Sequence, residues 1–267
     1  MSLSKKNLSQ NSCIKRLQEN IRENRRKHMR TFSITDIGMI RKVNQDFLFS
    51  CENPIGPLPN LFLVADGMGG YQAGDYASRC CVDTMVSVVK ESKLRSPIGI
   101  IESAIQAGNM AVFKDSEADA SLYGMGTTIV ATTIIGSELY VANVGDSRAY
   151  LIREGIHQIT EDHSWVEDMI RSGNLARKDA KGHPNKNVIT RAVGPAPVVQ
   201  ADFFELQVQE GDVILMCTDG LTNMVDDDQI CSIVKNKADI TLAGKELIRA
   251  ANANGGRDNI GIVLIEV

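Results

Sequence analysis

The chain has 267 residues, which suits one large domain or two small ones and is long enough to bury a substantial core. Its hydrophobic content of 43% and charged content of 23% are those of an ordinary soluble globular protein, and the net charge of −4 gives no indication of nucleic-acid binding. No apolar run approaches the roughly 18–20 residues of a membrane span, and the N-terminus lacks the apolar core of a secretory signal. We therefore expect neither a transmembrane segment nor a signal peptide.

The cysteines indicate the redox environment. All six lie outside C-x-x-C pairs and outside His/Cys clusters with zinc spacing. Most stand in apolar surroundings, as buried reduced thiols do. We therefore expect a cytoplasmic protein in a reducing compartment.

Residues 1–30 form a basic N-terminal extension, with nine Lys and Arg against two Glu, a net charge of +7. The rest of the chain therefore carries about −11, an acidic body that suits cations and argues against a nucleic-acid-binding protein with a basic arm. Two interpretations of the extension stay open. It is either a disordered or loosely docked tail, or a short amphipathic helix, about residues 12–27, that binds an anionic surface or a partner.

From residue 31 onward the pattern is that of one folded domain, residues 31–267. It begins with strands that are separated by a polar loop, 36–46, and a Pro-rich turn, 53–59: the strands are 31–35, 47–51 and 61–65. Two helices with one apolar face each are predicted next, the first after Gly74 and the second over about 97–114. Neither helix carries obvious chemistry.

Four short strands joined by Gly or Asp turns follow and are predicted to form an antiparallel meander: 127–135, 138–144, 147–153 and 156–160. Residues 163–195 contain a helix that ends near Arg171 and then a polar stretch without a periodic apolar face, which predicts a mobile surface excursion. The remaining elements are strands 201–206 and 213–218, helices 226–236 and 240–253, and a last strand 260–266. Because few βαβ alternations occur, we predict an α+β fold with mainly antiparallel sheets covered by helices.

An apolar strand that ends in a carboxylate organises this domain: residues 61–65 lead into Asp66, and three glycines follow within four positions. Further aspartates stand at strand ends beside Gly- or Asn-rich turns: Asp46, Asp146, Asp219 and Asp258. Asp-Gly is also ordinary turn chemistry, so one or two such sites arise by chance. Five of them favour a shared cation site. Oxygen ligands without His or Cys indicate magnesium or manganese rather than zinc.

Such a site suits the hydrolysis of a phosphate ester. Two or more ions that share a bridging carboxylate neutralise phosphoryl oxygens and lower the pKa of a bridging water. A phosphate also favours a planar bidentate cation, and Arg41 lies on the same loop as Asp46. The residues therefore point to metal-assisted phosphoester hydrolysis.

These residues belong to a set of motifs that resembles the metal-dependent type 2C Ser/Thr protein phosphatases (the PPM family), especially the compact bacterial branch. The matching segments occur in the family's order and include Asp36-x-Gly-x-x-Arg41-x-x-Asn-Gln-Asp46, Val64-Ala-Asp-Gly-Met-Gly-Gly70, Gly124-Met-Gly-Thr-Thr128, Val141-Ala-Asn-Val-Gly-Asp-Ser-Arg-Ala-Tyr150, Cys217-Thr-Asp-Gly-Leu221 and Arg257-Asp-Asn-Ile260. Each motif is weak by itself, whereas the ordered set is very specific. It spans residues 31–267 and leaves the first thirty residues outside.

The resemblance implies a fold, an activity and a set of partners. The fold is two stacked antiparallel β-sheets flanked by pairs of helices, an αββα sandwich with a metal cleft at one end. The activity is hydrolysis of phosphoserine and phosphothreonine on proteins by a metal-activated bridging water or hydroxide, without a covalent phosphoenzyme. The resemblance also implies two core Mn²⁺ or Mg²⁺ ions with an optional third, phosphoprotein substrates, a cognate Ser/Thr protein kinase, and a monomer that binds no nucleic acid.

Five matched positions would hold the core ions. The resemblance implies that Asp66 bridges two metals and that the Gly67 carbonyl helps to hold one of them. The carboxylates of Asp219 and Asp258 would complete the coordination of the other ion. Asp46 would act nearby, either directly or through metal-bound water.

Other positions match the rest of the site or depart from it. The resemblance implies a third, weaker ion at Asp146, a phosphate-binding role for Arg41, and a flap over residues 165–190 that borders the substrate cleft. Gln45 replaces a common Glu, which removes a negative charge near the second ion. Met68 stands where animal members carry a histidine proposed as general acid, and because methionine cannot deliver a proton, the leaving group would need another donor.

Three alternatives stay open at this stage. A pseudophosphatase would keep the fold as a binding or regulatory module, although it would normally have lost one of the core metal-binding aspartates, and all are present. A phosphatase dedicated to a partner-switching regulator usually stands beside sensor domains, which thirty residues cannot encode. For His163, capping of a helix by Asp162 or Ser164 explains the segment better than a catalytic role.

Overall fold

The computed structural model of the chain describes residues 29–70, 73–180 and 182–267. The two interpretations of the basic extension concern residues 1–28 almost entirely and lie outside the described residues. Among the helices that are described, none combines the length and the apolar character needed to cross a bilayer. The five cysteines in these ranges are free thiols, in agreement with the sequence prediction.

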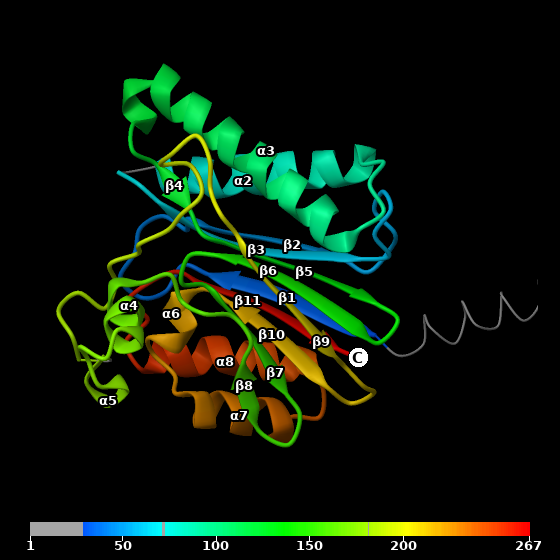
Figure 1. Cartoon of the computed structure of the whole chain (residues 1–267). Helices are drawn as coiled ribbons and strands as arrows, with labels where there is room; N and C mark the ends of the chain where they lie inside the picture. The colour runs from blue at the N-terminus through cyan, green and yellow to red at the C-terminus, as the bar shows by residue number, and fades with distance from the viewer. Residues whose placement is uncertain (1–28, 71–72, 181) are drawn as a thin grey trace, which may run out of the picture.

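Two antiparallel sheets form the centre of the molecule (Figure 1). The first sheet has the order β1-β11-β10-β7-β8, with β1 Arg30–Asp36, β11 Ile260–Glu266, β10 Val213–Cys217, β7 Arg148–Ile152 and β8 Ile156–Gln158. The second sheet has the order β2-β3-β5-β6-β9, with β2 Asp46–Cys51, β3 Leu61–Met68, β5 Ile129–Ile135, β6 Glu138–Val144 and β9 Asp202–Gln207. The short β4, Gly126–Thr127, pairs with β3.

Helices cover the outer face of each sheet and complete the αββα sandwich (Figure 1). The second sheet is covered by α2 Ala73–Glu91 and α3 Pro97–Ala118, after which a 3₁₀ turn spans Ala120–Leu122. The first sheet is covered by α7 Asp227–Asn236 and α8 Ile240–Ala253. Three shorter helices are α4 Trp165–Arg171, α5 Arg177–Ala180 and α6 Asp219–Thr222. The predicted α+β class and its two helix-covered antiparallel sheets are confirmed.

The packing of β3 explains why the strand that leads to Asp66 is apolar throughout. Leu61 and Leu63 pack with the core under α2 and α3, whereas Phe62 and Val64 pack into the core between the two sheets. Successive side chains of a strand point to opposite faces, and here both faces are covered. Full burial of each large side chain contributes about 1.5–3 kcal/mol to folding, so a polar residue on either face would be costly.

The predicted meander over residues 127–160 is wrong in its topology. β5 and β6 pair with each other in the second sheet, whereas β7 and β8 pair in the first. The chain crosses from one sheet to the other at residues 145–147, a change of direction that local strand patterns do not encode. The crossing places Asp146 between the ends of the two sheets.

The surface excursion over residues 163–195 has more structure than the sequence predicted. The helix that ends at Arg171 is confirmed as α4, and α5 was not predicted. Trp165 anchors the segment, because its ring stacks on that of His183 at 4.8 Å and its backbone N–H donates to the Val188 carbonyl at 2.8 Å. Arg177 forms an ion pair of 2.7 Å with Glu167. The mobility of the segment stays a prediction.

Candidate functional site

Asp46 and Asp66 stand directly opposite each other in the second sheet. Asp46 is the first residue of β2, and its Cα partner in the antiparallel register is Asp66 of β3. Opposed residues of an antiparallel pair project from the same face with Cβ atoms about 4.5–5.5 Å apart. Two carboxylates that were 20 residues apart in the sequence are therefore brought together by strand pairing alone.

Asp219 and Asp258 come from the first sheet, where β10 ends and β11 begins. These strands are neighbours, and the Thr218 N–H donates to the Gly261 carbonyl at 3.0 Å. The Thr218 hydroxyl accepts from the Gly261 N–H at 2.8 Å and donates to Oδ2 of Asp46 at 2.9 Å. This hydroxyl joins the two sheets, so all four carboxylates lie at the same end of the sandwich.

Hydrogen bonds fix the backbone on both sides of Asp66. Its N–H donates to Thr128 Oγ1, and its carbonyl accepts from the Thr128 N–H, each at 2.9 Å. The Thr127 hydroxyl also donates to this carbonyl at 2.9 Å. Thr128 Oγ1 lies 2.8 Å from Ser147 Oγ, next to Asp146. The short stretch before β5 therefore links the backbone of Asp66 to the side chain of Ser147, the residue after Asp146.

Burial and mutual repulsion disfavour the ionised form of these carboxyl groups. Burial is the largest cause for Asp46 and Asp66, and with the neighbouring carboxylates it raises their pKa values well above the usual range. Burial, followed by the charge of Asp219, raises the pKa of Asp146 to about 8. Burial, followed by the charge of Asp258, raises the pKa of Asp219 to about 6. A cation at this position would remove both penalties.

Among the described residues, two carboxylate oxygens of the candidate site are buried without a hydrogen-bond partner. Oδ1 of Asp46 and Oδ1 of Asp146 are buried and accept no hydrogen bond, although Asp46 is only 3% exposed. A buried oxygen without a partner costs about 1–3 kcal/mol, and more when it is charged. These atoms and the oxygen-only donor set fit a hard cation.

The side chains do not form a closed metal cluster as they stand. Among the described residues, no three His, Cys, Asp or Glu side chains are arranged so that they could hold one ion. Protein donors engage predicted ligands instead: besides the bond from Thr218 to Asp46, Arg41 Nη2 donates to Asp258 Oδ2 at 2.7 Å, and Asn223 Nδ2 donates to Asp219 Oδ2 at 2.8 Å. The fold thus gathers the predicted carboxylates at one end, and protein donors hold three of them.

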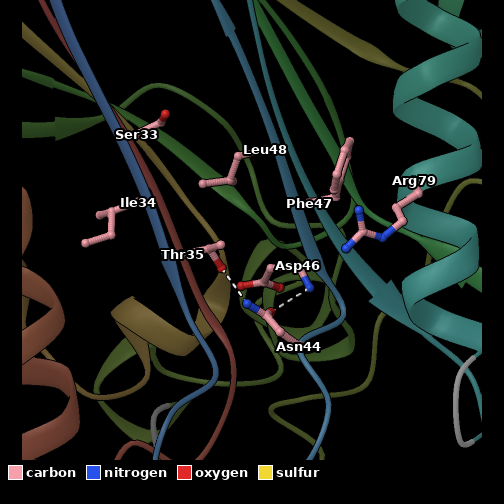
Figure 2. A pocket seen from close by; sticks show the side chains of 8 residues that line it. All are labelled: Ser33, Ile34, Thr35, Asn44, Asp46, Phe47, Leu48 and Arg79. Carbon is pink, nitrogen blue, oxygen red and sulfur yellow. Dashed lines mark hydrogen bonds between the residues drawn. The ribbon is translucent and has the colours of Figure 1, made fainter.

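A lateral opening between β1 and β2 reaches the Asp46 carboxylate. A cavity of about 270 Å³ between these two edge strands is lined by Asp46. Figure 2 shows the side chains that line it. Asn44 orders this position, because its Oδ1 accepts from the Asp46 N–H at 3.1 Å and its Nδ2 donates to Thr35 Oγ1 at 2.9 Å. Arg79 lies on the other side of the cavity, with its guanidinium 4.7 Å from the centre of the Phe47 ring.

Arg41 is positioned by a residue that the sequence interpretation did not single out. Asn259 is buried, and its Oδ1 accepts from the Gln45 N–H at 2.9 Å. Its Nδ2 donates to the carbonyls of Ile37 and Val43, both at 3.0 Å. One side chain therefore fastens the loop that carries Arg41 to the start of β11. A polar residue directly before a strand that is apolar up to its last residue was the available signal.

Close packing of the backbone explains the absence of a side chain at Gly67. A Cβ at Gly67 would lie 1.9 Å from the Gly74 carbonyl oxygen, and one at Gly74 would lie 2.7 Å from the Gly67 carbonyl oxygen. Both positions are bare because the start of α2 packs against the end of β3. The Gln45 side chain also lies against Gly74. A metal-binding role for the Gly67 carbonyl stays a prediction.

His163 has a structural role at the sheet crossing. Its ring is buried, Nδ1 accepts from the Gly145 N–H at 3.0 Å, and Nε2 lies 3.0 Å from Asp202 Oδ2. Burial lowers the pKa of His163 and thereby favours the neutral ring, and this effect outweighs the contact with Asp202, which raises the pKa. Ser164 caps α4 by accepting from the Glu167 N–H at 3.3 Å, so the predicted capping is confirmed.

In the described part of the 165–190 segment, Lys186 connects the segment to the site. Lys186 Nζ donates to Asn223 Oδ1 at 3.3 Å, and the amide of Asn223 in turn bonds to Asp219. Figure 1 shows α4 and α5 at the same end of the sandwich as α6, which begins with Asp219. The sequence did not indicate either Lys186 or Asn223, because neither belongs to a periodic pattern.

A sandwich of two helix-covered sheets, with buried carboxylates from both sheets at one end and an arginine beside them, is the architecture of a metal-dependent phosphatase. The family model for protein phosphatase 2C matches residues 30–168 and 176–260. The chain belongs to this family, whose members are metal-dependent protein serine/threonine phosphatases. It is an enzyme of that class.

Known relatives are similar over most of their length. The chain is 40% identical over 237 residues to the serine/threonine phosphatase stp of Listeria monocytogenes, covering 87% of this chain and 93% of that protein. It is 36% identical over 245 residues to the protein phosphatase PhpP of Streptococcus pneumoniae, covering 88% and 96%.

Solved structures show the same likeness. The serine/threonine phosphatase of S. agalactiae has a TM-score of 0.84 and 35% identity, covering 90% of this chain and all of that one. The catalytic domain of the phosphatase PstP, solved with two manganese ions, has a TM-score of 0.78 and 28% identity, covering 90% of this chain and 98% of that one.

Proposed function

We propose that this chain removes phosphate from phosphoserine and phosphothreonine in proteins with two Mn²⁺ or Mg²⁺ ions, and that a third ion binds at Asp146. The residues that would hold the two core ions are Asp46, Asp66, the Gly67 carbonyl, Asp219 and Asp258. The observation that carries this proposal is the opposed pair of Asp46 and Asp66, one of which keeps a buried oxygen without a partner. When bound, such ions supply positive charge for the phosphoryl oxygens and a nucleophilic water at neutral pH.

Arg41 would bind the phosphate. Its guanidinium is half exposed and lies 2.7 Å from Asp258, so the positive charge already stands at the rim of the site. A planar fork of N–H donors suits two phosphate oxygens at once. Asn259 fixes the backbone of the loop on which Arg41 stands, which reduces the entropy lost when the phosphate binds.

Met68 does not supply the leaving-group proton. Its Cε lies over Gly126, 3.2 Å from where a Cβ of that residue would stand, so the side chain acts as packing. Methionine carries no transferable proton. A donor other than residue 68 therefore protonates the leaving alkoxide in this proposal.

The finer assignments rest on the relatives and on composition. The printed names of the relatives describe serine/threonine phosphatases, which supports phosphoprotein substrates and a cognate Ser/Thr protein kinase for this chain. We propose a monomer that acts in the cytoplasm, in keeping with the free thiols of the described residues.

The experiment compares wild type with Asp219→Asn, and with Asp228→Asn on the exposed start of α7 as the matched control. With manganese, we expect wild type and the control to hydrolyse p-nitrophenyl phosphate and a phosphothreonine peptide, and EDTA to stop both. Asp219→Asn should reduce kcat by about 10²–10³-fold, the scale on which loss of one transition-state contact slows an enzyme. Isothermal titration calorimetry should show weaker manganese binding with folding intact. Full activity after removal of all metal would refute the proposal.

A further inference from the structure

Three large apolar side chains stand exposed on the loop directly before Arg41. Ile37 is 38% exposed, Met39 66% and Ile40 67%. We call these three residues the loop patch. Single exposed apolar residues need no explanation, but three within four positions beside a candidate site indicate a contact surface.

Hydrogen bonds hold the loop patch in its exposed position. Oδ1 of Asp36 accepts from the Gly38 N–H at 2.8 Å and from Asn252 Nδ2 at 3.0 Å. The Met39 N–H donates to the Gly256 carbonyl at 2.7 Å, and the Ile37 carbonyl accepts from Asn259. Gly38 has a φ of +79°, which other residues rarely adopt. Because the backbone is fixed at each of these points, the loop cannot turn its apolar side chains inward.

The loop patch directly precedes Arg41, the residue proposed to bind the phosphate. Ile40 is the sequence neighbour of Arg41, and consecutive Cα atoms are about 3.8 Å apart. A substrate chain in an extended conformation advances about 3.3–3.6 Å per residue. When its phosphate contacts Arg41, the side chains one to three residues away therefore lie within reach of the loop patch.

We propose that the loop patch binds an apolar side chain of the phosphoprotein substrate within three residues of the phosphorylated serine or threonine. The inference rests on the proposed function, since it takes Arg41 as the phosphate anchor. The substrate is the one partner that must approach Arg41 during the reaction, which selects it over a membrane or a second copy of the chain. The preferred substrate thus carries leucine, isoleucine, methionine or phenylalanine near its phosphorylated residue.

The test uses two phosphothreonine peptides that differ only in their flanks. One carries leucine at every position within three residues of the phosphothreonine, and the other carries glutamine there. The variant Met39→Gln/Ile40→Thr removes apolar surface. Glutamine keeps the length of methionine, and threonine keeps the β-branching of isoleucine. Leu242→Gln, at an exposed position of α8, is the matched control.

We expect wild type and the control to favour the leucine peptide by about tenfold in kcat/KM, the scale of one apolar contact in a binding pocket. The loop variant should lose this preference while its kcat/KM for p-nitrophenyl phosphate stays at the wild-type value. The same kcat/KM for both peptides with wild type would overturn the inference, and so would an equal loss on both peptides or on p-nitrophenyl phosphate. If wild type with manganese hydrolyses p-nitrophenyl phosphate but neither peptide, the proposed protein substrate fails as well. That result differs from a mere lack of preference.

Discussion

The Thr218 hydroxyl donates a hydrogen bond of 2.9 Å to Oδ2 of Asp46, and this bond connects the two sheets at the candidate metal site. The two residues are 172 positions apart in the chain. The same hydroxyl accepts from the Gly261 N–H at 2.8 Å, so its position is fixed from two sides. The orientation of the Asp46 carboxylate thus depends on the end of β10 as well as on its own strand.

Replacement of Thr218 by valine should therefore destabilise the protein. The variant leaves a buried carboxylate oxygen and a buried N–H without partners, and we expect a loss of about 2–4 kcal/mol in the free energy of unfolding. Thr218→Ser keeps the hydroxyl and should lose less than about 1.5 kcal/mol, the cost of one methyl group. Urea unfolding at pH 7 in EDTA measures both. Equal losses for the two variants would show that packing rather than the hydroxyl holds this position.

Replacement of Asn259 by alanine should loosen the loop that carries Arg41. Three backbone groups, those of Ile37, Val43 and Gln45, lose their partner, and the expected loss of stability is about 2–4 kcal/mol. The KM for p-nitrophenyl phosphate should rise, because Arg41 no longer stands in one place. Asn254→Ala is the control, since that exposed side chain makes one bond, to the Met224 carbonyl. An unchanged KM in a folded Asn259→Ala protein would contradict the positioning role.

The stability of the metal-free protein should fall as pH rises. The folded-state pKa values of Asp146, about 8, and Asp219, about 6, lie above the ordinary value of 3.8. Between the ordinary and the folded values the folded state binds more protons than the unfolded chain. The contribution of each carboxyl group to the free energy of unfolding is therefore complete below about pH 4. It is lost for Asp219 as pH rises through 6, and for Asp146 as pH rises through 8.

Thermal or urea unfolding in EDTA at pH 5, 7 and 8.5 measures this dependence. From pH 5 to pH 8.5, the free energy of unfolding should fall less in Asp146→Asn than in wild type, by at least about 1 kcal/mol. The variant lacks the carboxylate whose ionisation opposes folding. Manganese should restore the stability of wild type at pH 8.5, where ions no longer compete with protons for the carboxylates. A parallel pH dependence in wild type and Asp146→Asn would refute this assignment.

Replacement of Lys186 by methionine should strengthen metal binding. The ammonium group contacts the amide that bonds to Asp219, and it lowers the pKa of Asp219, although burial has the larger, opposite effect. A nearby positive charge repels a divalent ion, so its removal should lower the Kd for manganese by about two- to fivefold. Calorimetric titration measures the Kd. Lys235→Met, whose ammonium bonds to the Glu154 carbonyl, should leave it unchanged. Weaker binding in Lys186→Met would show that the contact holds Asp219 in place.

The sequence predicted much of the fold because helices and buried strands carry periodic signals. The buried strands β3, β10 and β11 have apolar runs, and α8 repeats its apolar residues with the helical period. The short α5 and the crossing at residues 145–147 were missed. A helix of four residues has too few turns for a periodic face, and a turn looks the same whether the next strand joins the same sheet or the other one.

The sequence by itself determined which carboxylates stand at strand ends, because a run of apolar residues that stops at Asp66 or Asp219 is visible without a structure. It also determined the family, through motifs in a specific order. Only the tertiary structure decided that Asp46 faces Asp66, that Thr218 connects the sheets, and that Asn259 and Asn223 hold the groups around the site. These relationships are single hydrogen bonds and strand registers between residues far apart in the chain, and neither leaves a local pattern that a sequence can show.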